Sequence, residues 1–181
     1  ALLLFISLPR LNNYQTRGQL TLKELSKPVT VTRDDSGMAY IHAKNIGDLF
    51  FAQGFVTAQD RLFQMQLTRL YFQGRLCELA GDRAKAVDIR MRTIGIDRMA
   101  RKQARILNDE SRRFFQRYVD GINAFIKTCP SDLHLEFSLA GITPDLWQVE
   151  DALGVLFYMG YSTAANLTTE IISQMLLDTL G

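Results

Sequence analysis

The sequence predicts an α+β domain in which helices predominate and a β-hairpin comes first. Two observations support this prediction. Apolar and polar residues alternate over residues 29–42, as in strands, whereas from residue 45 onward apolar residues recur mostly at three- and four-residue steps, as in helices. The 181 residues are 47% hydrophobic and 22% charged, which is typical of one globular domain with its own core.

The hairpin is predicted from residues 28–43, PVTVTRDDSGMAYIHA. Val29 and Val31 alternate with threonines, the chain turns through residues 34–37, and a second alternating run covers residues 38–42. Alternation on both sides of a turn-forming cluster is typical of two antiparallel strands.

A long helix is predicted from Asn45 onward, and it is apolar around most of its circumference. Its apolar residues form two neighbouring stripes: Phe51, Phe55, Ala58, Leu62, Met65, Phe72 and Leu76 on the first, and Ala52, Val56, Phe63, Leu67 and Leu70 on the second. A helix with this pattern is expected to be buried. Arg69 falls on the first stripe and Gln59 on the second, so both side chains need hydrogen-bonding partners where water is scarce.

The remainder of the chain is predicted to be largely helical. Helices are expected at about 83–106, at 109–129, from Pro144 through Leu156 and beyond, and from Asn166 or Leu167 to the end. One short strand is expected within residues 132–141, from an alternation of apolar and polar side chains: Leu133, Leu135 and Phe137 against His134 and Glu136.

Charge and cysteine usage exclude some function classes. The net charge is +2, with basic and acidic residues interspersed, so there is no basic block of the kind that binds a phosphate backbone, and no nucleic-acid partner is expected. Cys77 and Cys129 match no metal-ligand spacing. A zinc site is therefore not expected, a disulfide stays open, and two unpaired structural thiols are favoured.

The first residues, ALLLFISLP, are apolar and do not begin with Met. The run is typical of the end of a signal-peptide core or of a membrane anchor that begins upstream, yet it is too short to span a bilayer. An apolar lead-in segment docked on the body of the protein is the alternative, and both interpretations stay open. We therefore divide the chain into a lead-in segment, 1–28, and a domain, 29–181.

No catalytic motif is visible in the residues by themselves. His42 and His134 are the only histidines, and both occupy alternating positions that favour structural or surface roles in strands. The sequence has no nucleophile elbow, zinc-protease motif, glycine-rich phosphate loop or paired-carboxylate motif. Asp60 and Arg61 point to different sides of the predicted helix and are not a ready-made ion pair.

Residues 29–82 resemble the amino-terminal part of the α chain of the penicillin amidase family. Three motifs in register carry the resemblance: Arg33-Asp34-x-x-Gly37, GFVTAQDRLFQM at residues 54–65, and Gln73-Gly74-Arg75 followed by Glu78-Leu79 and Gly81. Weaker similarity continues through YVDGINAFI and GITPDLWQVEDAL. The chain departs from the family at residues 38–42, MAYIH, where members commonly have Val/Met-Pro-His-Ile, so the resemblance assigns His42 no role.

The resemblance implies a layered αββα fold of the N-terminal nucleophile hydrolases, in which this helix-rich chain shares its sheet with a longer β chain. Family members are made as one precursor and cut in two, and a chain that ends at Gly181 is similar to the α chain. The nucleophile, usually serine, is then the first residue of the β chain, and no catalytic residue is expected here. Its free α-amino group can serve as the base, because it titrates near ~7.7 to 8.0, against ~10.4 for lysine.

The implied activity is hydrolysis of the acyl side-chain amide of penicillin-like substrates through an acyl-enzyme. Two alternatives stay open: the same chemistry on N-acyl-homoserine lactones, and a noncatalytic helical partner subunit. The resemblance and the apolar amino terminus together imply a periplasmic or extracellular location, and the expected assembly is an αβ heterodimer.

The resemblance also implies candidate site residues. Those that align with the family's acyl-pocket positions are Met159, Tyr161, Thr163 and Ala164. Thr163 and Ala164 are small where phenylacetyl-specific members have arginine and aromatic side chains, which suggests a roomier acyl site. The alternative is a helix break with small packing residues.

Glu170 resembles a glutamate that ligates calcium in several members. The alternative is an acidic residue in the first turn of the last helix, capped by Asn166 or a nearby Thr. Because Ca²⁺ takes ~6 to 8 oxygen ligands, most of them would have to come from the β chain or water. With the nucleophile expected on another chain, four polar residues of the long helix are predicted to be structural and to tie it to neighbouring chains through hydrogen bonds and ion pairs: Gln59, Asp60, Arg61 and Arg69. The alternative is a direct catalytic role.

Overall fold

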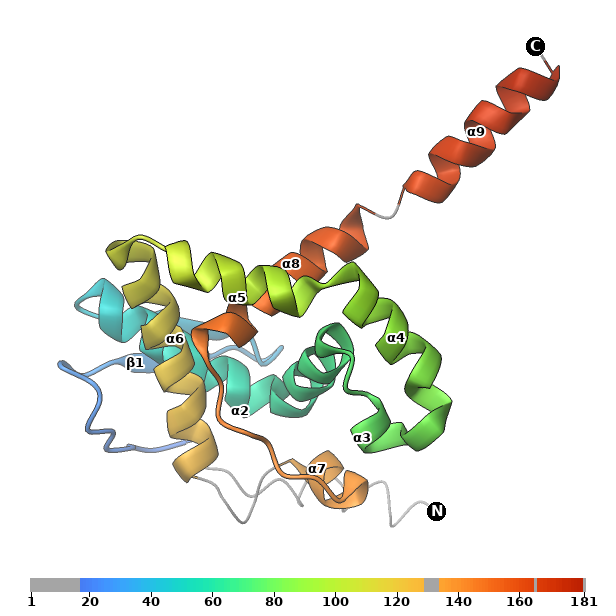
Figure 1. Cartoon of the computed structure of the whole chain (residues 1–181). Helices are drawn as coiled ribbons and strands as arrows, with labels where there is room; N and C mark the ends of the chain where they lie inside the picture. The colour runs from blue at the N-terminus through green and yellow to red at the C-terminus, as the bar shows by residue number, and fades with distance from the viewer. Residues whose placement is uncertain (1–16, 129–133, 165, 181) are drawn as a thin grey trace.

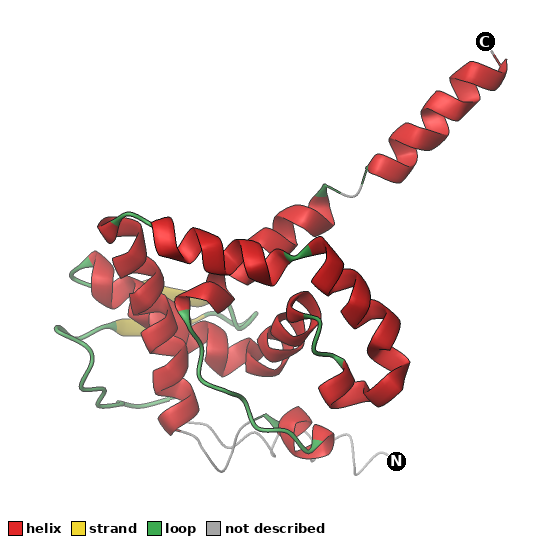
Figure 2. Ribbon diagram, in the orientation of Figure 1, coloured by secondary structure: helices red, strands yellow, loops and turns green. Residues whose placement is uncertain are grey.

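The computed structural model describes residues 17–128, 134–164 and 166–180. Its elements, in chain order, are β1 (Thr30–Arg33), β2 (Ala39–His42), α2 (Ile46–Gln73), α3 (Cys77–Ala80), a 3₁₀ turn η2 (Gly81–Ala84), α4 (Lys85–Ile94), α5 (Ile96–Ile106), α6 (Asp109–Thr128), α7 (Leu135–Ala140), α8 (Val149–Thr163) and α9 (Leu167–Leu180). Figures 1 and 2 show helices gathered around α2, with one small hairpin. The predicted helix-rich α+β character is confirmed for these residues.

The hairpin forms where the alternation predicted it. β1 and β2 are antiparallel, with Val31 opposite Ile41. The turn is fixed by Asp34, whose Oδ1 accepts hydrogen bonds from the backbone N–H groups of Ser36 at 3.0 Å and Met38 at 2.9 Å. His42 ends β2 as an exposed residue.

Arg33 fastens this hairpin to α2. Its two guanidinium nitrogens donate to both carboxylate oxygens of Asp60, at 2.9 and 2.8 Å, and Nη2 also donates to the side chain of Gln59 at 3.0 Å. The pair is partly exposed, with Arg33 at 25% and Asp60 at 36%. The predicted structural role of Asp60 therefore lies in a contact inside this chain.

Helix α2 is the central element, and most residues of its two apolar stripes are buried, while Phe63, Met65 and Leu67 are half-buried. Asn45 caps its amino end by accepting a hydrogen bond from the N–H of Asp48 at 2.8 Å. Gln59 and Arg69 are 7% and 2% exposed, as their positions on the stripes predicted. Arg61 is exposed and has non-helical backbone angles, φ −141° and ψ 19°, so the helix is kinked there.

Two glycines let α2 and α6 cross in direct backbone contact. A Cβ atom at Gly54 would lie 1.9 Å from the carbonyl oxygen of Tyr118, and one at Gly121 would lie 1.9 Å from that of Phe51. No larger residue fits at either place without moving a helix. The core forms around this crossing from buried side chains of α2, α6, α7 and the segment before α8: Phe51, Phe55, Ala58, Leu62, Val119, Ile122, Ala124, Phe125, Ile126, Phe137 and Trp147.

A buried carboxylate ties the segment before the hairpin to this core. Asp48 is 1% exposed and accepts hydrogen bonds from the Ser26 hydroxyl at 2.7 Å, the N–H groups of Ser26 and Lys27 at 3.0 and 2.9 Å, and the Asn45 amide at 2.6 Å. Arg117 on α6 approaches the same carboxylate at 3.2 Å. Burial alone would raise the pKa of Asp48, but these hydrogen bonds outweigh it and hold the pKa well below its usual value.

Three element predictions need correction. The strand within residues 132–141 is wrong: residues 135–140 form α7, with Phe137 packed edge-on against Phe63 at a centroid distance of 5.1 Å. Leu133 lies outside the described residues. The helix expected at 83–106 is interrupted at Gly95, whose φ of 81° separates α4 from α5.

The third correction concerns α8, which starts at Val149 and not at Pro144. The preceding residues are non-helical because Asn123 of α6 brackets Trp147, accepting from its N–H at 2.7 Å and donating to its carbonyl at 2.9 Å. Gln148 and Asp151 then form a capping box that begins the helix.

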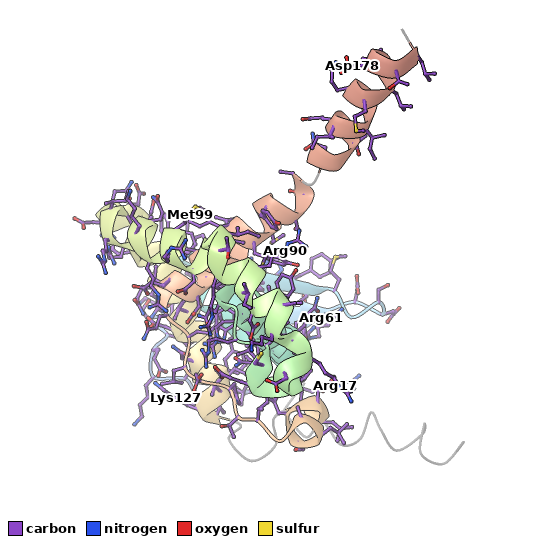
Figure 3. All side chains as sticks on the ribbon, turned by 45° about the vertical axis from the view of Figure 1, so that its right-hand side comes forward. Arg17, Arg61, Arg90, Met99, Lys127 and Asp178 are labelled. Atoms are coloured by element: carbon purple, nitrogen blue, oxygen red, sulfur yellow. The ribbon has the colours of Figure 1, made fainter. Side chains whose placement is uncertain are left out.

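Helix α9 is confirmed and extends away from the body (Figure 1). Figure 3 shows its side chains, Asp178 among them, standing clear of the rest. Its large apolar side chains are at least half exposed: Ile171, Ile172, Met175, Leu176, Leu177 and Leu180. Over the described ranges, no helix combines the length and the apolarity that crossing a bilayer requires. Cys77 is a half-buried free thiol, and Cys129 lies outside the described residues.

Candidate functional site

An open, mostly apolar groove of about 800 Å³ lies between α2, α6 and α8. Its lining comes from α2 (Phe50, Gln53, Thr57, Arg61, Gln64, Met65 and Thr68), from α6 (Ser111, Phe114, Phe115 and Tyr118), from Trp147, and from α8 (Ala152, Val155, Leu156, Tyr158 and Met159). The volume lies within the ~300–1,000 Å³ typical of ligand sites.

Aromatic pairs hold the walls of this groove. Phe50 of α2 stacks on Phe114 of α6 at a centroid distance of 5.0 Å, and Tyr71 of α2 meets Tyr158 of α8 edge-on at 5.2 Å. Burial raises the pKa of Tyr118, although a hydrogen bond with Thr57 offsets part of the rise, so its hydroxyl stays protonated at neutral pH. Apart from Arg61, the groove is therefore lined by uncharged side chains, six of them aromatic.

The position of α8 is set by two contacts with the second half of α2. A Cβ atom at Gly154 would lie 2.3 Å from the ring of Phe72, so only glycine allows the two helices to pack this closely. Nearby, the buried guanidinium of Arg69 reaches Asp151 in the first turn of α8, with Nη1 3.4 Å from Oδ2.

Arg69 connects several parts of the chain besides α8. Its Nη2 donates to the Gln66 side chain at 2.6 Å and to the carbonyl of Asp145 at 3.2 Å, and its Cζ lies 5.0 Å from the centroid of the Trp147 ring. Burial lowers the pKa of Arg69 and raises the pKa of Asp151, and in each case the ion pair offsets only part of the burial effect. Such a network specifies geometry, in agreement with the structural role predicted for Arg69.

The four predicted acyl-site residues all lie on or just after the last turns of α8 and are exposed. Met159 is 57% exposed and belongs to the groove lining. Tyr161, Thr163 and Ala164 lie beyond the groove; the Tyr161 hydroxyl accepts from Arg90 at 3.4 Å, and Thr163 donates back to the carbonyl of Met159 at 2.9 Å. Their assignment to an acyl site stays a prediction.

Sequence reasoning did not identify the other groove residues. Phe114, Phe115 and Tyr118, like Val155 and Tyr158, follow three- and four-residue helical steps, which is a signal the sequence contains. That signal marks an apolar face but does not distinguish a face that is covered from one that is open.

Glu170 lies exposed in the first turn of α9, where its carboxylate accepts a hydrogen bond from the Asn166 amide at 2.9 Å. The position in the first turn agrees with the alternative of an acidic residue at the helix start, but this contact joins two side chains and is not a helix cap. Within the parts of the chain that the structure describes, no group of three or more His, Cys, Asp and Glu residues is placed to hold a metal ion. These residues by themselves do not fit a calcium site, which needs ~6 to 8 oxygens.

The two histidines lie in different surroundings. His134 is 5% exposed, and its Nε2 lies 2.7 Å from the carbonyl oxygen of Gln59, to which it donates. His42 is on the exposed end of the hairpin. The expectation that the nucleophile lies on another chain stays a prediction.

Comparisons with known proteins agree with the sequence resemblance. The sequence profile of the penicillin amidase family matches residues 28–181. The acyl-homoserine lactone acylase QuiP of Pseudomonas aeruginosa is 35% identical over 166 residues, which are 92% of this chain and 20% of that protein. The penicillin acylase 2 proenzyme of Pseudomonas sp. is 38% identical over 143 residues, 79% of this chain and 18% of that protein.

A solved structure extends the agreement to the fold. A thermostable penicillin G acylase from Alcaligenes faecalis is similar with a TM-score of 0.65 and 26% sequence identity, over 79% of this chain and 75% of the matched chain. This chain thus spans about a fifth of the length of the curated relatives, yet most of one chain of a solved relative.

Proposed function

Because this chain belongs to the penicillin amidase family, we propose that it is the α chain of an amidohydrolase that cleaves the acyl side-chain amide of penicillin-like substrates. The single observation that carries this proposal is the family match over residues 28–181. The structure supports it by presenting the four predicted acyl-site residues as exposed side chains at one end of α8.

A β chain from the same precursor completes the enzyme. The lengths of the relatives support this. The curated relatives are about five times longer than the part of them that this chain matches, whereas the matched chain of the solved relative is similar in length to this chain. The name of one relative, a proenzyme, agrees with processing. A two-stranded hairpin is marginal by itself, so β1 and β2 join a sheet in a layered αββα fold that the β chain supplies.

The reaction follows from an amino-terminal nucleophile on that β chain. Its free α-amino group takes the proton of the hydroxyl as the oxygen attacks the amide carbonyl. The amine then leaves with a proton, and the acyl group stays as an ester until water hydrolyses it and restores the hydroxyl. This chain contributes the wall beside the acyl group, with α8 held in place by Arg69 and Asp151.

A second candidate substrate is an N-acyl-homoserine lactone, which the same chemistry would cleave. The similarity to QuiP favours it, because that match covers 92% of this chain. The two substrates differ in the amine, while the residues proposed here face the acyl group. Acyl selectivity and amine selectivity can therefore be measured separately.

A substrate panel tests the proposal on the full-length gene product. Phenylacetyl, hexanoyl and dodecanoyl amides are offered on both a β-lactam amine and homoserine lactone, and released amine is measured. Thr163→Arg and Ala164→Phe restore bulk at the predicted acyl site, so dodecanoyl substrates should lose kcat/KM about 10-fold or more relative to hexanoyl ones. The matched control is Thr93→Arg, on an exposed residue of α4 that makes the same back-bond as Thr163, here to Ile89 at 2.8 Å.

The outcomes separate the proposals. Unchanged acyl preference in the Thr163 and Ala164 variants removes these residues from the acyl site. Absence of hydrolysis on every amide, with a second chain still bound, favours the noncatalytic partner subunit.

Glu170 supplies one calcium ligand in this proposal, and the β chain and water supply the others. Elemental analysis should show that Glu170→Gln loses bound calcium, whereas the control variant Glu136→Gln retains it. The location is periplasmic or extracellular, which fractionation of the native cells tests.

A further inference from the structure

Arg61 is the one charged residue among those that line the groove between α2, α6 and α8. It lies at the kink of α2 and is labelled in Figure 3. Its sequence neighbour Asp60 is already engaged by Arg33 at 2.8 and 2.9 Å. Within the described part of the chain, the guanidinium of Arg61 takes part in no hydrogen bond or ion pair, so water solvates it as the chain stands.

The groove has the composition of an interface. Six of its lining residues are Phe, Tyr or Trp, two are Met and one is Arg; none is Lys, Asp or Glu, and Gln, Thr, Ser, Ala, Val and Leu make up the rest. Aromatic residues, Met and Arg are enriched at protein–protein contacts, where Lys, Asp and Glu are depleted. The open apolar surface continues onto Leu156 and Met159, which are 54% and 57% exposed.

Covering this groove with an apolar surface would remove the water around Arg61. A buried guanidinium without an acceptor is costly, and a carboxylate is the acceptor that matches its planar donors best. A partner that covers the groove and buries Arg61 is therefore expected to bring an acidic side chain to it, together with apolar side chains for the aromatic walls.

We propose that this groove seats a segment of the β chain that presents apolar side chains and one Asp or Glu, whose carboxylate pairs with Arg61. The inference rests on the proposed two-chain enzyme. The occupant is assigned to the β chain because about four-fifths of the length of the curated relatives lies outside the part matched by this chain. Arg61 then acts as the charged anchor of the contact between the chains.

Site-specific cross-linking in the full-length processed enzyme tests the contact. Gln64 lies on the exposed rim of the groove, three residues beyond Arg61. A photoreactive amino acid at position 64 should cross-link to one β-chain peptide that contains an Asp or Glu within a few residues. A cross-link to a second copy of this chain, to a peptide without an acid, or to nothing in an active two-chain enzyme overturns the proposal.

Charge reversal then tests the ion pair. Arg61→Glu should weaken the association of the two chains roughly 30-fold or more, and exchanging the cross-linked acid for Arg should restore it. Arg61→Lys should retain part of the association. Arg105→Glu, on an exposed residue of α5 outside the groove, is the matched control and should leave association unchanged.

The failures of the two proposals are distinguishable. If the gene product contains no second chain, or hydrolyses no acyl amide, the proposed function fails. If a two-chain acylase forms and Arg61→Glu changes KM for acyl substrates while association stays the same, then the groove binds substrate and only the present inference fails.

Discussion

Arg69 of α2 and Asp151 of α8 form a buried ion pair, with Nη1 and Oδ2 3.4 Å apart, although 82 residues separate them in the chain. The pair fixes the amino end of α8, and the predicted acyl-site residues lie at its other end. Because burial shifts both pKa values against the charged forms, the contact specifies position more than it adds stability.

Removing one partner of this pair should be far more damaging than removing both. Arg69→Met leaves the Asp151 carboxylate without its guanidinium, and Asp151→Leu leaves Arg69 with only the exposed Asp145 carboxylate at 3.8 Å. Each change should cost about 3–5 kcal/mol in the free energy of unfolding, whereas the double variant should cost less than the sum of the two. Urea unfolding of the purified enzyme measures this. Asp97→Asn breaks the exposed pair with Arg101 and should cost no more than about 0.5 kcal/mol. Additive losses would contradict the coupling.

The close crossing of α2 and α6 predicts that a side chain added at Gly54 destabilises the fold. Gly54→Ala places a methyl group 1.9 Å from the backbone carbonyl of Tyr118, which cannot move without its helix, so a loss of about 3 kcal/mol or more is expected. Gly160→Ala is the matched control, since nothing lies within 4 Å of its Cβ position; it should be neutral or stabilising by roughly 0.5–1 kcal/mol. Thermal unfolding compares the two, and equal melting temperatures would contradict the crossing geometry.

The buried carboxylate of Asp48 should make the free energy of unfolding fall at acidic pH. Its pKa in the folded chain lies below its usual value of 3.8, so the unfolded chain takes up the proton first. The stability that Asp48 contributes is complete above that value and is lost as the pH falls below it. Asp48→Asn should lower the free energy of unfolding by about 2 kcal/mol at pH 7. The difference in this free energy between the variant and the wild type should become smaller as the pH falls below 3.8. A gap that stays constant with pH would exclude this role.

The ion pair between Arg33 of the hairpin and Asp60 of α2 should contribute modestly to the free energy of unfolding. Arg33 and Asp60 are partly exposed, so Asp60→Asn is expected to lower the free energy of unfolding by about 1 kcal/mol or less. If the hairpin belongs to a sheet shared with the β chain, precursor processing should also slow. Normal processing and turnover with undiminished thermal stability would refute a structural role for Asp60.

The hairpin and α2 were predictable because their signals are local. Alternation around a Gly-containing turn gave the strands, and two apolar stripes gave the buried helix together with the burial of Arg69. The short helix α7 was missed because a histidine was counted as polar. His134 and Phe137 are both buried and lie three residues apart, which is helical spacing.

The candidate site was less predictable because it depends on which apolar faces meet. Met159 was proposed for an acyl site through the family resemblance, whereas Trp147 and Phe114 join the groove only through the crossing of helices distant in sequence. The partner of Arg69 was likewise hidden, since 82 residues separate it from Asp151. Such contacts follow from tertiary packing, which no local pattern encodes.

The intact mass of each polypeptide, measured after the full-length gene product is mixed with an acyl amide and rapidly quenched in acid, tests the central claim most directly. The account predicts that this chain co-purifies with a second one, that the mass of the acyl group appears on that second chain, and that residues 1–181 remain unmodified. An acyl group on this chain, or hydrolysis without a second chain, would contradict it.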